Sequence, residues 1–217
     1  MNRRIRWTLA ALLALAPLAG LAPAARAQGD DAGPKALALG SVAPMRDAAM
    51  KSVDGKPVSI ASAAGPKGTL VLFICNHCPW VKAWQSRIAE LGNAAARQGV
   101  GVIAINSNDP VAYPEDDYDG MVARAKEVGY TFAYVVDATS DVARAFGATH
   151  TPEAFLFDAR GKLVYHGAVD DNAHDASAVH EHWLADAVSA VAAGKPVATA
   201  ESKAMGCGIR YRAEKSQ

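Results

Sequence analysis

Cysteine is scarce in this chain, because its 217 residues include three of them. So few cysteines exclude a small fold that several disulfides hold together. An excess of charge of one sign is also lacking, since 22 lysines and arginines balance 22 aspartates and glutamates. No stripe of basic residues appears, so we expect no nucleic-acid partner and no binding to an anionic membrane surface. Internal repeats are absent as well, which excludes a repeat architecture.

A long apolar run occurs at the N-terminus. Three arginines within the first six residues precede an apolar stretch from Thr8 to Ala22, and Ala25-Arg26-Ala27 fits the small-x-small cleavage pattern. This organisation is that of a secretory signal peptide, and the prolines and glycine that interrupt it favour a cleaved signal over a permanent membrane span. We expect cleavage near Ala27/Gln28, a periplasmic or secreted mature protein, and no stable membrane insertion afterwards. An uncleaved anchor is the alternative.

Four segments are expected along the chain. Residues 1–27 form the signal peptide, and residues 28–39 form a polar linker that contains glycine. Residues 40–194 form one domain, because the part of the chain that remains after cleavage suffices for one well-packed core and not for two. Residues 195–217 form a C-terminal tail.

The most informative motif is Cys75-Asn76-His77-Cys78-Pro79, which directly follows an apolar run from Thr69 to Ile74. The run has the length of a buried strand, and proline is favoured at the first position of a helix. Cys78 is then expected at a helix N-cap, beside unpaired backbone N–H groups and the positive end of the helix dipole. Such a position lowers the pKa of a cysteine from about 8.5 to roughly 3.5–7.5. His77 can add positive charge or a hydrogen bond.

The two cysteines of this motif are expected to cycle between dithiol and disulfide. A turn across Asn76 and His77 brings their sulfurs within bonding range. A purely structural bridge is disfavoured, because closing so short a loop removes little entropy from the unfolded chain. A zinc site would need two further ligands, and the sequence has no second paired Cys/His unit. We therefore expect no metal and no other cofactor.

The rest of the sequence alternates short apolar runs with amphipathic segments, which predicts an α/β fold. Strand–helix–strand succession favours right-handed crossovers between parallel strands, and the turn from Asp158 to Gly161 favours an antiparallel hairpin. Asp54-Gly55 predicts a small N-terminal hairpin extension within residues 42–59. The expected architecture is a central mixed sheet flanked by helices. Strands are expected over residues 69–74, 100–105, 132–136, 154–157 and 162–166, and helices over 79–98, 115–128, 140–146 and 179–192.

From about Gly40 to Ala193 the chain resembles the thioredoxin-like superfamily. The resemblance rests on the C-x-x-C pair at a strand-to-helix junction, on Thr151-Pro152, and on Phe155-Leu156-Phe157-Asp158 followed by a hairpin and a helix. More narrowly, the chain is similar to the redoxin branch that holds peroxiredoxin-like proteins and periplasmic thiol-disulfide oxidoreductases, within the alkyl hydroperoxide reductase/thiol-specific antioxidant group. The resemblance implies a thioredoxin-like fold with a redox-active centre.

The resemblance also implies roles for particular residues. Pro152 is expected in the cis form against the reactive sulfur, so that Thr151-Pro152 docks the substrate chain. Cys78 falls on the position of the attacking cysteine, whereas the usual second cysteine, three residues later, is Val81 in this chain. Cys75 is then the resolving partner, reaching Cys78 from the strand side.

A peroxidase would need two side chains that this sequence lacks. The threonine expected three residues before the reactive cysteine is Cys75, and the arginine expected at the position of Pro152 is missing. Those side chains hydrogen-bond and polarise a hydroperoxide, so their loss favours disulfide exchange over peroxide reduction.

Two further residues are candidates near the thiols. Cys207 lies in a glycine-flanked part of the tail and could resolve a mixed disulfide or a sulfenic acid on Cys78, with a free or packed thiol as the alternative. Trp80 is expected to be exposed near the thiols, where it can shape substrate access, whereas Trp84 and Trp183 are expected in the core.

Three polar clusters have simpler readings. Residues 106–109 follow a strand at the edge that carries Cys75 and could line the site, but ordinary turn chemistry is favoured. Metal-type side chains between residues 170 and 182 are read as a solvated helix start, because His180 and His182 would point different ways on a helix. The acidic residues 115–117 are read as a helix N-terminus favoured by the dipole.

We therefore expect an exported enzyme, a thiol-disulfide oxidoreductase that cycles the Cys75/Cys78 pair on protein substrates. In an exported protein this pair needs a redox partner protein, because the compartment oxidises it. A thiol-dependent peroxidase and a partner-binding protein without turnover are alternatives. A further alternative is a redoxin that holds copper with Cys75, Cys78 and a histidine.

Overall fold

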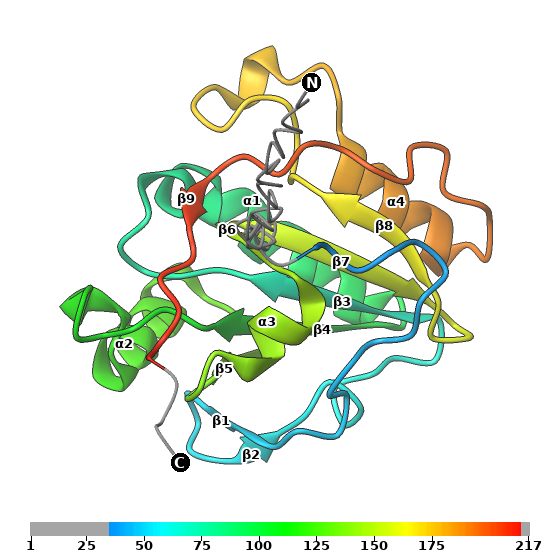
Figure 1. Cartoon of the computed structure of the whole chain (residues 1–217). Helices are drawn as coiled ribbons and strands as arrows, with labels where there is room; N and C mark the ends of the chain where they lie inside the picture. The colour runs from blue at the N-terminus through cyan, green and yellow to red at the C-terminus, as the bar shows by residue number, and fades with distance from the viewer. Residues whose placement is uncertain (1–34, 214–217) are drawn as a thin grey trace, which may run out of the picture. The chain divides into compact units, whose positions relative to one another are not determined.

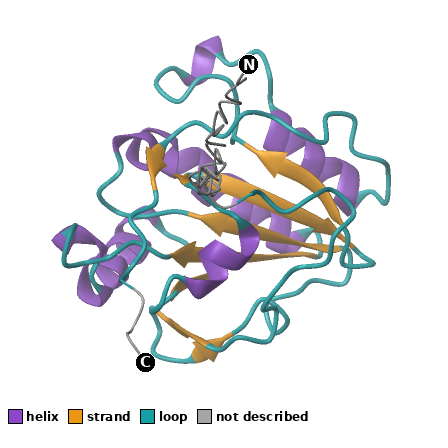
Figure 2. Ribbon diagram, in the orientation of Figure 1, coloured by secondary structure: helices purple, strands orange, loops and turns teal. Residues whose placement is uncertain are grey.

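The computed structural model describes residues 35–213. The expected signal peptide, its cleavage position and most of the expected linker lie outside the described residues. Within residues 35–213, no helix combines the length and the apolar character needed to cross a bilayer. These residues form an α/β structure in which helices cover both faces of a sheet (Figures 1 and 2).

The main sheet has the strand order β2-β1-β5-β4-β3-β7-β8. Strands β3, β4 and β5 are parallel, whereas β7 and β8 continue the sheet in antiparallel fashion, so the expected mixed sheet is confirmed. The hairpin around Asp54-Gly55 joins the sheet through β1, which pairs with β5. The strands are β1 (Met50–Ser52), β2 (Pro57–Val58), β3 (Gly68–Phe73), β4 (Val100–Asn106), β5 (Ala133–Val136), β6 (His150–Thr151), β7 (Glu153–Asp158), β8 (Leu163–Gly167) and β9 (Cys207–Gly208).

Strand β3 is buried along its whole length. A continuous apolar run is typical of a strand that is covered on both faces. In the register of the sheet, Phe73 at the end of β3 lies opposite Ile105 of β4 and Glu153 at the start of β7. The segment that leaves β3 and the segment that enters β7 therefore meet at one edge of the sheet.

Two apolar cores lie on opposite faces of the sheet. Leu70 and Leu72 of β3 pack with helices α1, α2 and α4 on one face. Val71 and Phe73 point to the other face, as alternation along a strand requires, and pack with α3. The helices are α1 (Pro79–Arg97), α2 (Tyr118–Val128), α3 (Asp141–Phe146) and α4 (Trp183–Ala192), with short 3-10 helices η1 (Pro114–Asp116) and η2 (Ala176–Ala178).

Helix α1 begins and ends where local signals predict. Cys78 is its N-cap with an extended backbone, and Pro79 occupies the first helical position. Gly99 follows the helix with φ 89°, a left-handed conformation that glycine adopts without strain. Trp84 and Ile88 are buried on one stripe of the helix, so its amphipathic pattern is confirmed.

Two helices begin later than predicted. Helix α4 begins at Trp183 instead of residue 179, because the preceding segment is held in a loop in which the Asp171 carboxylate accepts from the His180 N–H at 3.0 Å. Helix α2 begins at Tyr118 instead of residue 115, because Asp117 caps it by accepting from the Gly120 N–H at 2.7 Å. Because α4 begins at Trp183, His180 and His182 do not lie on a helix.

The segment after residue 194, which was expected as a tail, folds back and supplies one strand of a second sheet, which has two strands, β6 and β9. Its strand β9 pairs antiparallel with β6, so that Cys207 lies opposite Thr151. In Figure 1 this segment is the red chain that runs from beyond α4 to β9. On either side of β9 the Ser202 N–H donates to His166 O at 3.0 Å and the Ile209 N–H donates to Thr149 O at 2.8 Å.

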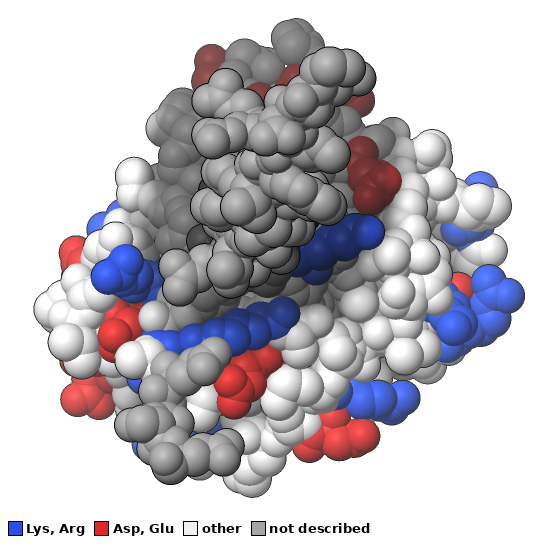
Figure 3. All heavy atoms as spheres, viewed as in Figure 1, with Lys and Arg blue, Asp and Glu red and all other residues white. Residues whose placement is uncertain are grey.

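Charged side chains of both signs are interspersed on the surface. Figure 3 shows basic and acidic groups side by side on the face in view. Several form ion pairs, such as Lys56 with Asp54 at 3.2 Å and Arg144 with Asp141 at 3.3 Å. Exposed pairs of this kind contribute little to stability.

Candidate active site

All three cysteines meet at the sheet edge where β3 ends, and all are free thiols. Cys78 Sγ lies 2.7 Å from Cys207 Sγ, and Cys75 Sγ lies 3.1 Å from Thr151 Oγ1. Cys78 is 0% exposed and Cys75 is 1% exposed. The structure therefore adds the tail thiol to the two thiols of the C-x-x-C motif.

Thr151 and Pro152 lie directly against these sulfurs. The peptide bond between them is cis, as the resemblance implied. The Thr151 carbonyl oxygen is 3.2 Å from Cys78 Sγ, and the Thr151 backbone pairs with Cys207. Thr151 thus contacts Cys75 through its hydroxyl, Cys78 through its carbonyl and Cys207 through its strand pairing.

The pKa of Cys78 is lowered to about 4. The largest cause is a hydrogen bond from the Cys75 thiol, while burial opposes the shift and the Cys207 thiol and the Val81 backbone N–H assist it. The Val81 N–H belongs to the first turn of α1, but its effect is smaller than that of either thiol, and the Cys78 side chain makes no full capping hydrogen bond. The predicted thiolate thus depends more on neighbouring thiols than on the helix end, although its position at the N-cap is confirmed.

The two neighbouring thiols keep their protons. Burial raises the pKa of Cys75 far above its usual value, with further contributions from hydrogen bonding to Cys78 and from the charge of Asp116. Burial also raises the pKa of Cys207 to about 12, again with a contribution from Cys78. At neutral pH the site therefore holds one thiolate, on Cys78, between two thiols that can donate to it.

A hydrogen bond from His77 to Cys78, one of the two roles expected for this histidine, is not formed in the structure. The His77 ring stacks on Tyr113 with centroids 3.7 Å apart, and its Nδ1 lies 2.5 Å from Asp116 Oδ2. Asp116 is 1% exposed, and its other carboxylate oxygen accepts from the backbone N–H groups of Asn76 and His77. The helix-start reading was wrong for Asp116, because η1 turns this carboxylate inward, where it fixes the C-x-x-C turn. Sequence reasoning missed both Asp116 and Tyr113.

Among residues 35–213, Cys75, His77 and Asp116 are the group that could hold a metal ion. One potential ligand atom from each lies within 4.8 Å of the others. Thiolate, imidazole and carboxylate together suit an ion such as zinc or copper. Binding would have to break the hydrogen bond between His77 and Asp116 and remove the proton from Cys75, whose pKa is raised by burial.

The exposure expected of Trp80 was wrong. Its indole is half-buried and packs on Trp84 and His174, with ring centroids 5.8 Å and 5.5 Å away. The spacing i, i+4 places Trp80 over Trp84 on α1, which explains this packing. The Trp80 backbone N–H hydrogen-bonds the Cys207 sulfur, which lowers the pKa of Cys207 slightly against the effect of burial. Trp84 is fully buried as predicted, and Trp183 is partly buried against the same core.

A buried carboxylate that sequence reasoning missed supports the segment before Pro152. Glu153 is 2% exposed, and its Oε2 accepts from the backbone N–H groups of Thr149 and His150 at 2.7 Å and 2.9 Å. Its Oε1 lies 2.7 Å from His166 Nε2. Glu153 thereby fixes the backbone that leads into Thr151. An acidic residue inside an apolar strand was the available signal.

The loop formed by residues 106–109 anchors the C-terminal segment. Asn106 Oδ1 accepts from the Asn108 N–H at 3.0 Å, which is the turn chemistry that was favoured. In addition, Asn108 Oδ1 accepts from the Arg210 N–H at 2.7 Å, and the Asp109 N–H donates to Arg210 O at 2.8 Å. The loop therefore reaches the site indirectly, by holding the chain that carries Cys207.

The acidic cluster near residue 170 is in part a buried structural pair and not a solvated helix start. Asp170 is 4% exposed and accepts from Trp84 Nε1 at 2.7 Å. Its other oxygen forms an ion pair with Arg87 of α1. The prediction of a solvated helix start was wrong for Asp170, because its partners Trp84 and Arg87 lie more than eighty residues earlier in the chain.

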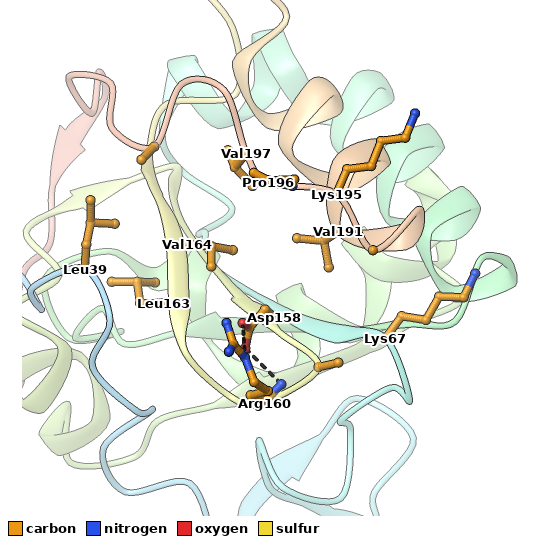
Figure 4. Close-up of a pocket in the computed structure, with 13 residues that line it drawn as sticks. Leu39, Lys67, Asp158, Arg160, Leu163, Val164, Val191, Lys195, Pro196 and Val197 are labelled. Carbon is orange, nitrogen blue, oxygen red and sulfur yellow. Dashed lines mark hydrogen bonds and ion pairs between the residues drawn. The ribbon is translucent and has the colours of Figure 1, made fainter.

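A large surface hollow lies at the opposite end of β7. It has a volume of about 610 Å³ and lies beside the Asp158–Arg160 turn, with apolar Leu163 and Val191 in its wall. Figure 4 shows the side chains of Lys67 and Lys195 extending away from it. Glu153 pairs with Phe73 at the thiol end of the sheet, and Asp158 pairs with Gly68 at the other end, so this hollow is separate from the cysteines.

Comparison with known proteins agrees with the geometry. Residues 39–166 match the family described as AhpC/TSA family. A thiol-disulfide oxidoreductase ResA of Geobacillus thermodenitrificans is 29% identical over 128 residues, which are 59% of this chain and 68% of that protein. The crystal structure of a hypothetical protein from Sinorhizobium meliloti 1021 superposes with a TM-score of 0.76 at 37% identity, covering 82% of this chain and 97% of that one. The thioredoxin domain of a Bacteroides vulgatus thiol-disulfide oxidoreductase, with a TM-score of 0.50 at 24% identity over 60% of this chain and 89% of that one, confirms the thioredoxin-like fold.

Proposed function

The chain belongs to the AhpC/TSA family of thioredoxin-like oxidoreductases, and from this premise we propose that it is an exported thiol-disulfide oxidoreductase acting on protein substrates. The observation that carries the proposal is the Cys78 sulfur, whose pKa is lowered to about 4 chiefly by a hydrogen bond from the Cys75 thiol, with the Cys207 sulfur 2.7 Å away. A thiolate at neutral pH is the nucleophile that disulfide exchange requires. Export is supported by the signal-peptide pattern of residues 1–27.

The reaction follows from the positions of the two thiols in the C-x-x-C motif. The Cys78 thiolate attacks one sulfur of a substrate disulfide, forms a mixed disulfide and expels the second substrate sulfur, which takes up a proton. Cys75 then loses its proton to the departing substrate sulfur and attacks Cys78 Sγ. The products are a Cys75–Cys78 disulfide and a substrate dithiol. A redox partner protein returns two electrons to the pair, which regains one proton on Cys75 and leaves Cys78 as the thiolate.

The partner chain docks at Thr151-Pro152 in this proposal. Support comes from the pairing of β9 with β6, because the Thr151 backbone already accepts an extended strand there. Main-chain hydrogen bonds of this kind bind extended peptides with little dependence on their side chains.

Insulin reduction tests the assignment of the two thiols. In Cys78→Ser the rate with dithiothreitol as reductant should fall to the background rate, because no other thiolate is available for first attack. Cys75→Ser is the matched variant, and it should still form mixed disulfides while turning over more slowly. If Cys75→Ser alone abolished adduct formation while Cys78→Ser kept it, the roles would be reversed.

Peroxide reduction and copper carriage are the alternatives to this proposal. Cys75, which stands where a peroxidase has threonine, contacts the Thr151 hydroxyl and donates its one proton to the Cys78 thiolate, so it has no proton left to polarise a hydroperoxide. Peroxide consumption with a sulfenic acid on Cys78 would favour the first alternative. Stoichiometric copper that is lost in either cysteine variant would favour the second.

A further inference from the structure

The proposed nucleophile is closed to partners in the structure. Cys78 is 0% exposed, yet disulfide exchange needs its sulfur to contact a sulfur of another protein. The sulfur of Cys207 lies 2.7 Å from the sulfur of Cys78. A partner disulfide can reach Cys78 only after the chain that carries Cys207 has moved.

That chain occupies the edge at which a partner strand would dock. Cys207 lies opposite Thr151 in an antiparallel pairing, with Gly208 opposite His150. A cysteine seated opposite Thr151 and in contact with Cys78 has the placement that a substrate cysteine needs for attack. Residues 203–209, which we call the covering segment, therefore hold the position of a substrate.

Both ends of the covering segment are anchored. On one side, Ser202 Oγ accepts from the Ala168 N–H at 2.9 Å and lies 2.7 Å from the Tyr165 hydroxyl. On the other side, the Arg210 N–H donates to Asn108 Oδ1 at 2.7 Å. Movement of the covering segment therefore need not release the rest of the C-terminal chain, and Cys207 stays near the site after it leaves Cys78.

Glycine at position 206 allows the close approach of this segment. A Cβ atom at Gly206 would lie 2.1 Å from the Thr151 carbonyl oxygen, which no side chain tolerates without displacement of the backbone. At Gly208 the nearest atom to such a Cβ is Thr149 O at 3.9 Å, so that position has room. The two glycines offer a matched pair of positions for a test.

We propose that the covering segment is an internal occupant of the docking edge, which leaves Cys78 to admit a partner disulfide and then returns to resolve the mixed disulfide through Cys207. This inference rests on the proposed function and deepens it by adding Cys207 as a second resolving thiol, which competes with Cys75 for the mixed disulfide on Cys78. Because segment and partner compete for the Thr151 backbone, return of the segment also expels the partner chain.

The chemistry of the return step balances without an added reagent. The mixed disulfide joins Cys78 Sγ to one substrate sulfur. Cys207 gives up its proton and attacks Cys78 Sγ, so that a Cys78–Cys207 bond forms and the bond to the substrate breaks. The departing substrate sulfur takes the proton and leaves as a thiol. The substrate disulfide is thereby reduced by two electrons, and Cys78 and Cys207 are oxidised by the same two.

Alkylation of the reduced protein tests the covering role. Gly206→Ala should unseat the segment and raise the rate of iodoacetamide reaction at Cys78 about tenfold, which corresponds to about 1.4 kcal/mol of seating free energy. Gly208→Ala is the matched control and should stay near the wild-type rate, because the nearest atom to its methyl group is Thr149 O at 3.9 Å, an ordinary contact. Circular dichroism of both variants checks that the domain stays folded. Equal rates in the two variants would overturn the covering role.

Disulfide mapping tests the resolving role without disturbing the backbone. One equivalent of oxidised glutathione should yield a Cys78–Cys207 disulfide beside the Cys75–Cys78 disulfide in the wild type, and the Cys78–Cys207 disulfide alone in Cys75→Ser. In Cys207→Ser the glutathione adduct on Cys78 should persist longer. A wild-type product confined to Cys75–Cys78, with an adduct lifetime that Cys207→Ser leaves unchanged, would overturn this role.

The two levels of proposal fail in different ways. If Cys78→Ser retained insulin reduction, the proposed function itself would fall. If that variant lost activity but the mapping showed no bond to Cys207, the inference on the covering segment would fall and the proposed function would stand.

Discussion

Replacement of Cys75 by alanine should raise the pKa of Cys78, because the Cys75 thiol is the largest stabilising contact of the thiolate. A hydrogen bond to a charged group contributes about 1.5–3 kcal/mol, and one pH unit corresponds to about 1.36 kcal/mol. Loss of this bond should therefore raise the pKa of Cys78 from about 4 by about one to two pH units. Cys207→Ala should raise it less, because that contact is a smaller cause.

Serine at position 75 provides the matched control. Its hydroxyl is of similar size to the thiol and can still donate to the Cys78 thiolate, whereas alanine cannot. Cys75→Ser should therefore keep the Cys78 pKa near the wild-type value. A loss of packing at this buried position would affect both variants, so the difference between them isolates the hydrogen bond.

The assay is the pH dependence of thiolate absorbance in the reduced protein, with Cys78→Ser as the blank. Alkylation of the Cys78 peptide, followed by mass spectrometry, gives the same midpoint by a second route. The midpoint is the diagnostic quantity, and the plateau rate is not, because intrinsic nucleophilicity rises with pKa and offsets the loss of thiolate. A Cys75→Ala midpoint equal to that of Cys75→Ser would refute the assignment of the Cys75 thiol as the main donor.

Two further predictions concern stability. A cysteine whose pKa is lowered on folding adds stability that is fully present above its unfolded pKa of about 8.5 and is lost as pH falls through the folded value. The unfolding free energy of the reduced wild type should therefore exceed that of Cys78→Ser by an amount that grows from about pH 4 to about pH 8.5. Urea titrations at a series of pH values measure this difference. A flat difference over this range would contradict the lowered pKa. Glu153→Ala should lower the unfolding free energy by about 3 kcal/mol or more in the same assay, because it leaves the buried N–H groups of Thr149 and His150 without their acceptor. Glu153→Gln keeps an oxygen at this position and should lower the unfolding free energy by less. Equal costs would show that the carboxylate does not hold this backbone.

The elements around the C-x-x-C motif were predictable because their signals are local. The apolar run of β3, Pro79 at the first helical position and Gly99 after α1 each act within a few residues of the structure they determine. The same holds for the turn at Asp54-Gly55, which forms the expected hairpin. Prediction was less accurate where a helix start depended on a particular cap, as at Asp117.

The polar contacts of the site were not predictable in the same way. Asp116 contacts the Asn76 and His77 backbone from about forty residues further along the chain. Cys207 contacts Cys78 across 129 residues, and its segment is positioned by the loop that contains Asn108. Nothing in the local sequence of either residue identifies its partner. Such contacts follow from the register of the sheet and from which loops meet at its edge.

The arrangement of three thiols also affects how readily Cys75 and Cys207 ionise before and after a mixed disulfide forms on Cys78. In the resting state Cys75 and Cys207 keep their protons partly because both donate to the Cys78 thiolate and feel its charge. In the proposed reaction Cys78 enters a mixed disulfide and loses that negative charge, so these two contributions to the raised pKa values of Cys75 and Cys207 disappear. The thiol that resolves the adduct is therefore easier to ionise after the adduct has formed than before. Formation of the mixed disulfide thus prepares the step that breaks it.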